Sequence, residues 1–304
     1  MNPAMIAQMV PVVVVTHAGP TERTQRCLAS LAATEQAAPV VVVDNSDGPP
    51  CASGTYGPGI VHVVRTPNHG YGAAANVGFD TVRRLAPEAS AVALLNDDIE
   101  VEPGWLGPLV DALDGGADVA QPKLLQSPRS SQPSVNSVGV QLDSSGAGAD
   151  IGCGEPDSDA FELGSDIVIF TGGAIVLTRD FLDATGGFDE RYFLYYEDVD
   201  LALRGGELGR RYRCEPASMV WHEGGATTGD LGVERRRLQE RNRLWCALRF
   251  LPAAGIARAF GLSIRRLRHA PRGVHARALI GGLGGAPALL IARFKARRTI
   301  EMAA

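Results

Sequence analysis

Four short apolar runs, each closed by polar or turn-forming residues, dominate the first hundred positions of the chain. They are VPVVVVTHAG at 10–19, PVVVVDNSDG at 39–48, IVHVVRT at 60–66 and AVALLNDDIEV at 91–101. Continuous runs of β-branched residues are typical of strands buried on both faces of a parallel sheet. The sequence therefore predicts a parallel sheet built early in the chain.

Helical segments follow the first, third and fourth of these runs, and the second and third runs are successive strands. TERTQRCLASLAAT at 21–34 places its apolar residues on one face, a second helix is expected from about Ala73, and a third begins with Pro103 near its first turn. Residues 126–160 predict loop and irregular structure. A strand, a glycine turn and a strand follow in SDIVIFTGGAIVLT, and then a helix from near Glu197. This alternation predicts an α/β fold with a mainly parallel sheet flanked by helices.

Composition narrows the class of protein. The net charge of -5 over 304 residues gives no indication of nucleic-acid binding. The start, MNPAMIAQMV, has no basic segment before an apolar one, so no secretory signal is expected. The longest uncharged apolar run, at 278–292, is shorter than the roughly 18 residues of a membrane span. Five cysteines without metal-ligand spacing favour a reduced, intracellular protein.

Polar side chains follow the predicted strands where each one ends. In open parallel sheets ligands bind beyond the carboxyl ends of the strands, so these residues are expected to form one site. Taken singly, DNSDG is also a good turn sequence. The polar residues at the strand ends are Thr16, His17, Asp44, Asn45, Asn96, Asp97 and Asp98.

The adjacent carboxylates of Asp97 and Asp98 repel one another, and burying them without a partner is costly. Either the strand runs out into solvent, or a cation lies there. Mg²⁺ and Mn²⁺ are held by one or two carboxylates together with substrate phosphates, which would suit a nucleotide diphosphate. The small residues of NHGYGAAANVG at 68–78 would let the backbone approach a phosphate, although the pattern matches neither a P-loop nor GxGxxG.

A second acidic group lies in YYEDVDLALR. Carboxylates in the first turn of a helix stabilise its positive end, which accounts for one or two acids without any chemistry. The aromatic approach RYFLYY and the preceding TGGA instead indicate a pocket for an acceptor.

Six landmarks in order carry a resemblance. They are VVVVTHAGPTERTQRCLASL, VVVDNSDG, NHGYGAAANVG, LLNDDIEVEPGWL, TGGAIVLTRDFLDATGGFDERYFLYYEDVDLALR and VWHEGG. Over residues 10–245 the chain resembles the inverting nucleotide-sugar glycosyltransferases of family 2, which have the GT-A fold. Within that family it looks most like the bacterial rhamnosyltransferases.

The resemblance implies a role for each matching residue. Asp198 would be the general base. Asp98 and His222 would hold a divalent metal, Mn²⁺ or Mg²⁺, although a histidine beside Trp221 can also be purely structural. Gly172, Gly173 and Glu197 would face the acceptor. The nucleotide sugar would be bound by Thr16, Asp44, Asn45, Gly70, Asn76, Asn96 and Asp97.

The resemblance also implies the partners. The donor would be a dTDP-, UDP- or GDP-linked sugar, with dTDP-rhamnose the leading expectation, and the acceptor a cell-envelope glycan or polyprenyl-linked sugar at the cytoplasmic face of the membrane. Two rivals stay open. A nucleotidyltransferase should have a glycine-rich, basic loop directly after the first strand, whereas THAGPTERTQR has one glycine. A sugar-nucleotide-binding scaffold would have no reason to keep EDVD.

The end of the chain differs from the rest in charge. Between Arg241 and Ile300 there are 13 Lys or Arg and no Asp or Glu. We expect a glycosyltransferase domain at 1–245 and a basic, amphipathic helical tail at 246–304. Such a tail can lie on an anionic membrane surface, form a homo-oligomer contact, or be a solvated pair of helices.

Overall fold

The computed structural model describes residues 10–17, 19–34, 38–48, 56, 61–224, 232–269 and 271–303. The strands of the main sheet are β1 (Val12–Thr16), β2 (Val40–Asp44), β3 (Val61–Arg65), β4 (Ala91–Asn96), β5 (Ile99–Val101), β6 (Val119–Gln126), β7 (Val135–Ser137), β10 (Ser165–Ile167), β11 (Ala174–Thr178) and β12 (Tyr212–His222). A separate hairpin is formed by β8 (Val140–Leu142) and β9 (Gly148–Asp150).

The helices follow the alternation expected from the sequence. They are α2 (Glu22–Ala32), α3 (Tyr71–Leu85), α4 (Leu106–Asp114), α5 (Arg179–Thr185), α6 (Glu197–Glu207), α7 (Gly232–Phe250), α8 (Ala253–Arg266) and α9 (Arg272–Ala303). Two short 3₁₀ turns, η1 (Asp159–Phe161) and η2 (Glu190–Tyr192), complete the described elements.

The main sheet has the order β10-β12-β6-β11-β4-β1-β2-β3. The strands β1, β2, β3 and β4 are parallel, and β6 and β12 point the same way, because β11 pairs antiparallel with both β4 and β6. The strand β10 runs against β12 at the edge. The α/β class with a mainly parallel sheet is confirmed.

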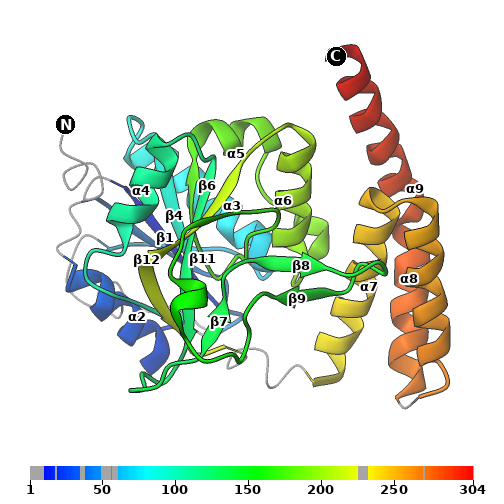
Figure 1. Cartoon of the computed structure of the whole chain (residues 1–304), viewed down its shortest axis with the longest axis horizontal. Helices are drawn as coiled ribbons and strands as arrows, with labels where there is room; N and C mark the ends of the chain where they lie inside the picture. The colour runs from blue at the N-terminus through cyan, green and yellow to red at the C-terminus, as the bar shows by residue number, and fades with distance from the viewer. Residues whose placement is uncertain are drawn as a thin grey trace.

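Helices cover both faces of this sheet (Figure 1). Alternate residues of β1 point to opposite faces: Val12 and Val14 pack with α2 and α4, whereas Val13 and Val15 pack with α3, α5 and α6. Both layers are buried, which explains why the strands are apolar without alternation.

Three strand predictions need correction. The segment 91–101 is two strands, since β4 ends at Asn96 and β5 turns back to pair with β12. The strands β6 and β12 were not anticipated, because Pro122 and Lys123 interrupt the apolar pattern of one and Pro216 lies at a register shift in the other. The region 126–160 is not wholly irregular, since it contains β7, β8 and β9.

The C-terminal helices α7, α8 and α9 pack together beside the sheet domain, and the end of α9 projects past the other two (Figure 1). The boundary expected between residues 245 and 246 falls inside α7. Among the described residues, the segment Arg272–Phe294 is long and apolar enough to cross a membrane, judged by its length and composition alone. Cys27, Cys153, Cys214 and Cys246 are free thiols, while Cys51 lies outside the described residues.

Candidate active site

The carboxyl ends of β1, β2 and β4 lie side by side at one edge of the sheet. Thr16 is paired with Asp44, and Val15 with Asn96. Because β11 runs the opposite way, its start meets the end of β4 at this edge, where the amide of Asn96 donates to the carbonyl of Gly173. The structure therefore brings most of the expected site residues together.

Asp97 begins the turn between β4 and β5, and its carboxylate contacts side chains of β1 and α2. Its Oδ2 accepts hydrogen bonds from Thr16 Oγ1 (2.7 Å) and Thr24 Oγ1 (3.2 Å), and its Oδ1 lies 3.9 Å from Nε of Arg23. Burial raises the pKa of Asp97 above its ordinary value, although the bond from Thr16 and the charge of Arg23 oppose that rise. The negative charge of Asp97 is therefore stabilised by hydroxyl groups and an arginine of the protein itself.

The carboxylate of Asp98 has fewer hydrogen-bond donors around it than that of Asp97. Its Oδ1 is buried, lies 3.3 Å from Nε2 of His222, and has no hydrogen-bond donor among the described residues. Burial alone would raise the pKa of Asp98, but His222 outweighs it and holds that pKa below its ordinary value. Nδ1 of His222 pairs with Oδ1 of Asn136 at 2.9 Å. Because Oδ1 of Asn136 can only accept, Nδ1 of His222 donates this bond, and Nε2 is the ring nitrogen that faces Asp98.

This pair fits a divalent metal. A carboxylate oxygen and a ring nitrogen face one another, and the orphaned Oδ1 of Asp98 is the kind of atom that a cation satisfies. No cluster of three or more His, Cys, Asp or Glu able to hold a metal occurs among the residues that the structure describes. The protein would therefore supply part of the ligand set and a substrate diphosphate the rest, as in many Mg²⁺ and Mn²⁺ sites.

The residues expected to bind the nucleotide lie at the end of β2 and the start of α3. Asp44 and Asn45 are almost fully buried. Oδ1 of Asp44 accepts from the amide of Ser46 at 3.0 Å, and Nδ2 of Asn45 donates to the carbonyl of Gly70 at 3.2 Å. Oδ1 of Asn45 is buried without a hydrogen-bond donor among the described residues. The sequence suggested that α3 starts near Ala73, but it starts at Tyr71, directly after Gly70.

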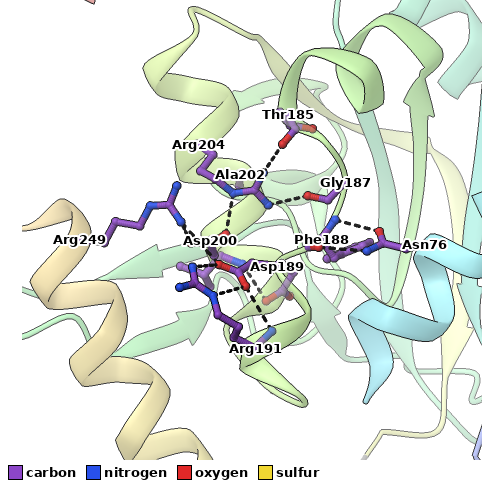
Figure 2. A network of polar contacts seen from close by, with 12 residues as sticks. Asn76, Thr185, Gly187, Phe188, Asp189, Arg191, Asp200, Ala202, Arg204 and Arg249 are labelled. Atoms are coloured by element: carbon purple, nitrogen blue, oxygen red, sulfur yellow. Dashed lines mark hydrogen bonds and ion pairs between the residues drawn. The ribbon is translucent and has the colours of Figure 1, made fainter. Parts of the chain in front are cut away.

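Asn76 points elsewhere. Its Nδ2 donates to the carbonyl of Phe188 (3.0 Å) and to Oε1 of Glu190 (3.1 Å), and its Oδ1 accepts from the amide of Phe188 (3.0 Å). Figure 2 shows this amide joined to the loop between α5 and α6. Asn76 therefore positions that loop, and we do not retain it among the residues expected to line the diphosphate.

The carboxylates of Glu197 and Asp198 open α6. Oδ2 of Asp198 accepts from the amide of Gly172 at 2.9 Å, and its Oδ1 accepts from the amide of Val199 at 2.8 Å. A Cβ on the neighbouring Gly173 would lie 3.7 Å from Cε1 of His222. Of this pair of glycines, Gly172 therefore contacts Asp198 and Gly173 lies beside His222.

The pKa values of Glu197 and Asp198 are both raised above their ordinary values. Burial, with the charge of Asp198 as a second cause, raises the pKa of Glu197 to about 8, and its Oε2 is buried without a hydrogen-bond donor among the described residues. Burial also raises the pKa of Asp198, although the amides of Gly172 and Val199 oppose the shift. Both carboxyls are therefore protonated more readily than ordinary acids, and Glu197 has no amide that opposes the shift except its own.

An ion-pair network holds α6 in place (Figure 2). Asp200 is fully buried and accepts from Nε of Arg204 (2.7 Å) and from a terminal nitrogen of Arg249 (3.0 Å). Arg204 also donates to the carbonyls of Thr185 and Gly187. Since Arg249 belongs to α7, the C-terminal helices are joined to the helix that carries the acids.

Sequence reasoning missed four side chains that shape this site. Arg23 and Thr24 contact Asp97, Asn136 contacts His222, and Asn242 of α7 donates to three carbonyls in the loop before Glu197. Arg23 and Thr24 stand in the quoted landmark after β1, so helix periodicity could have found them. Nothing in the sequence indicated Asn136 or Asn242.

Solved structures identify the fold. A structure of GalNAc-T7 with UDP, GalNAc and Mn²⁺ superposes with a TM-score of 0.61 at 14% identity, covering 89% of this chain and 54% of its own, so this chain spans about half of it. The mannosyltransferase PcManGT from Pyrobaculum calidifontis, in complex with GDP-Man and Mn²⁺, superposes with a TM-score of 0.51 at 16% identity, covering 93% of this chain and 85% of its own. The architecture is that of the GT-A glycosyltransferases.

Sequence comparison narrows the class further. The model of glycosyl transferase family 2 matches residues 12–137. The N-acetylglucosaminyl-diphospho-decaprenol L-rhamnosyltransferase of Mycobacterium tuberculosis, in strains H37Rv and CDC 1551, is 31% identical over 244 residues, which are 74% of this chain and 79% of that protein. The chain belongs to glycosyltransferase family 2, and the resemblance inferred from its landmarks is confirmed.

Proposed function

We propose that the protein is an inverting transferase that moves a sugar from a nucleotide-diphospho sugar to a hydroxyl of a lipid-linked glycan. The observation that carries this proposal is the arrangement around Gly172 and Gly173. On one side lie Asp98 and His222, suited to a metal and a diphosphate, and on the other lies the carboxylate of Asp198. A sugar between them would have its leaving group and its attacking hydroxyl on opposite sides.

Asp198 is the proposed general base. The acceptor hydroxyl attacks the anomeric carbon, the bond from that carbon to the diphosphate breaks with its electron pair, and Asp198 takes the hydroxyl proton. One displacement inverts the anomeric configuration. The amides of Gly172 and Val199 fix the carboxylate and leave each oxygen a second lone pair. Glu197, largely protonated at neutral pH, is suited to donate a hydrogen bond to the acceptor.

The donor would be bound at the strand ends. Asp44, Asn45 and Gly70 would hold the nucleotide, and Asn96 would face the sugar, since its Oδ1 is buried without a donor among the described residues. Thr16 would act through Asp97, which it holds in place. Mn²⁺ or Mg²⁺ bound by Asp98 and His222 would offset the negative charge on the leaving diphosphate.

The rhamnosyltransferase relative supports a choice of partners. We infer a dTDP-rhamnose donor and a polyprenyl-diphosphate-linked sugar as acceptor, with the enzyme working at the cytoplasmic face of the membrane in cell-wall biogenesis. A dTDP donor and UDP or GDP donors differ in the base that the end of β2 must accept, so a binding panel can separate them.

Thermal-shift binding tests the proposal. dTDP-, UDP- and GDP-linked sugars are added with and without Mn²⁺ to the wild type, Asp98→Ala and Asp198→Asn. We expect one nucleotide class to raise Tm in a metal-dependent manner, the effect to be lost in Asp98→Ala, and Asp198→Asn to bind the donor but transfer almost no sugar. Absence of any shift in folded wild-type protein would contradict donor binding at this site, and wild-type turnover by Asp198→Asn would remove the base assignment.

A further inference from the structure

The outward face of α9 is apolar over about four turns. Ile280 is 69% exposed, Leu283 54%, Ile291 56% and Phe294 65%. These positions, together with the exposed Pro287, are separated by three or four residues and so form one stripe on the helix. The segment 278–292 contains no polar side chain, so no polar group interrupts this face. A helix apolar all round is ordinarily buried, and here one side is open.

The inward face of α9 is fixed to α7. Gly282 and Gly285 lie against the side chains of Leu244 and Trp245, so the two helices approach closely. Nδ1 of His275 pairs with the buried carboxylate of Glu240 at 2.5 Å. These contacts pack α9 along α7, which carries polar and charged side chains. Lipid could surround α9 only if the contacts with α7 were broken. The geometry therefore favours a helix lying in the plane of a membrane over one that crosses it.

Basic residues flank the apolar stripe. Arg265, Arg268, Arg272 and Arg277 are exposed near the turn between α8 and α9, and the sequence continues past Phe294 with Lys295, Arg297 and Arg298. Basic groups near an anionic membrane surface are attracted to it and strengthen binding. Two copies packed through the stripe would bring basic ends together in either orientation, and like charges repel. An anionic lipid surface fits this distribution and a second copy does not.

We propose that the outward face of α9, defined by Ile280, Leu283, Pro287, Ile291 and Phe294, binds the surface of an anionic membrane. Acyl chains would cover the stripe, and headgroups would meet Arg272 and Arg277 at its N-terminal end. The helix α7 lies between this surface and the loop that precedes Glu197. Arg241 of α7 lies against Gly281 of α9 and donates to the carbonyl of Tyr192 at 2.7 Å. Membrane docking would thus bring lipid-linked acceptors close to the site, although the binding itself does not depend on the proposed function.

Vesicle co-sedimentation tests the surface without any sugar substrate. The full chain is mixed with phosphatidylcholine vesicles, with or without about a third phosphatidylglycerol, at low and high salt. Ile280→Asp/Ile291→Asp removes the stripe, and Arg272→Glu/Arg277→Glu reverses charge at one end. The matched control is Leu163→Asp, since Leu163 is 84% exposed far from α9 in the chain. Tm of each variant is measured alongside.

We expect the wild type to bind the anionic vesicles, with weaker binding at high salt, and each double variant to lose about tenfold or more in affinity. Leu163→Asp should bind as the wild type does. The proposal is overturned if the wild type does not sediment with anionic vesicles, or if both double variants bind like the wild type. A dimer in light scattering that Ile280→Asp/Ile291→Asp dissociates, without vesicle binding, would assign the stripe to a second copy. Donor binding in the thermal-shift panel is read separately, so failure here leaves the proposed reaction untouched.

Discussion

Nδ2 of Asn242 lies 2.6 Å from the carbonyl oxygen of Tyr195, two residues before Glu197. The same nitrogen donates to the carbonyls of Tyr192 and Leu194, and Asn242 is fully buried. The loop it holds is strained, since Phe193, Tyr195 and Tyr196 have φ of 67°, 69° and 69°. Such conformations cost about 1–3 kcal/mol each and persist only where the surroundings enforce them. Asn242 is therefore a positioning residue for the two acids.

Asn242→Asp should lower kcat at least about tenfold while leaving the KM for the donor nearly unchanged. Aspartate has the shape of asparagine but cannot donate, so the carbonyls of Leu194 and Tyr195 lose their side-chain donor, that of Tyr192 keeps Arg241, and the loop relaxes. We expect the free energy of unfolding to fall by about 1–3 kcal/mol. The matched control is Arg236→Ala, an exposed position on the same helix, which should leave both quantities unchanged. A variant with wild-type kcat would show that the loop holds its shape without this donor.

Glu197→Gln should change the pH dependence of stability. The pKa of Glu197 is about 8 in the folded chain against an ordinary 4.5, so between these values the folded state keeps a proton that the unfolded state has lost. Stability arising from this group is present below pH of about 4.5 and is lost progressively as pH rises to about 8. The variant lacks this loss. Its Tm relative to the wild type should rise across that window, and a constant difference would refute the shifted pKa.

Asn136→Ala should weaken metal binding without removing either proposed ligand. Asn136 pairs with Nδ1 of His222 and sets which ring nitrogen faces Asp98. Loss of such an outer partner typically costs 10–100-fold in metal affinity. We expect the Mn²⁺ concentration needed for the nucleotide-induced thermal shift to rise by about that factor. EDTA should abolish the shift in both proteins, and an unchanged Mn²⁺ titration would exclude the role assigned to Asn136.

Gly70→Ala should strongly destabilise the fold. Gly70 has φ of 96°, and a Cβ there would overlap the backbone of Phe193. We expect a loss of at least about 3 kcal/mol in urea unfolding. Gly107→Ala is the control, because Gly107 lies in α4 with open space around its Cβ position, and alanine should stabilise a helix there by about 0.5–1 kcal/mol. Equal stability of the two variants would contradict the close approach at Gly70.

The parallel strands and their polar ends were predictable, because a strand buried on both faces records its environment in an uninterrupted apolar run. The strand β6 was not, because Lys123 lies inside it fully buried, paired with Asp157 (2.9 Å) and Glu162 (2.7 Å) on either side of η1. From sequence alone a lysine is expected at the surface, because lysines are rarely buried without charged partners. Tertiary contacts, not local pattern, made this segment a strand.

In the candidate site, too, some residues could be placed from the sequence and others could not. The strand-end residues could be placed together because parallel strands share an edge, and the family resemblance supplied roles for Asp98 and His222. The side chain of Asn76 could not be placed, because its helix could turn it toward the strand ends or toward the loop at 188–190. Asn242 lies about fifty residues after the loop it holds, and no local periodicity connects the two.

The antiparallel pairing of β11 with β4 has a consequence for how specificity can diverge in this enzyme. Everything proposed to hold the donor precedes residue 99 except His222, whereas Asp198 and the glycines facing the acceptor follow residue 170. The two parts are joined by a ladder from Ala174 opposite Leu95 to Thr178 opposite Ala91, whose backbone hydrogen bonds do not depend on side-chain identity, and by the contacts of Gly70 and Asn76 with the loop at 188–193. Acceptor preference can therefore change by substitution elsewhere in the second part while the donor-binding part is inherited intact.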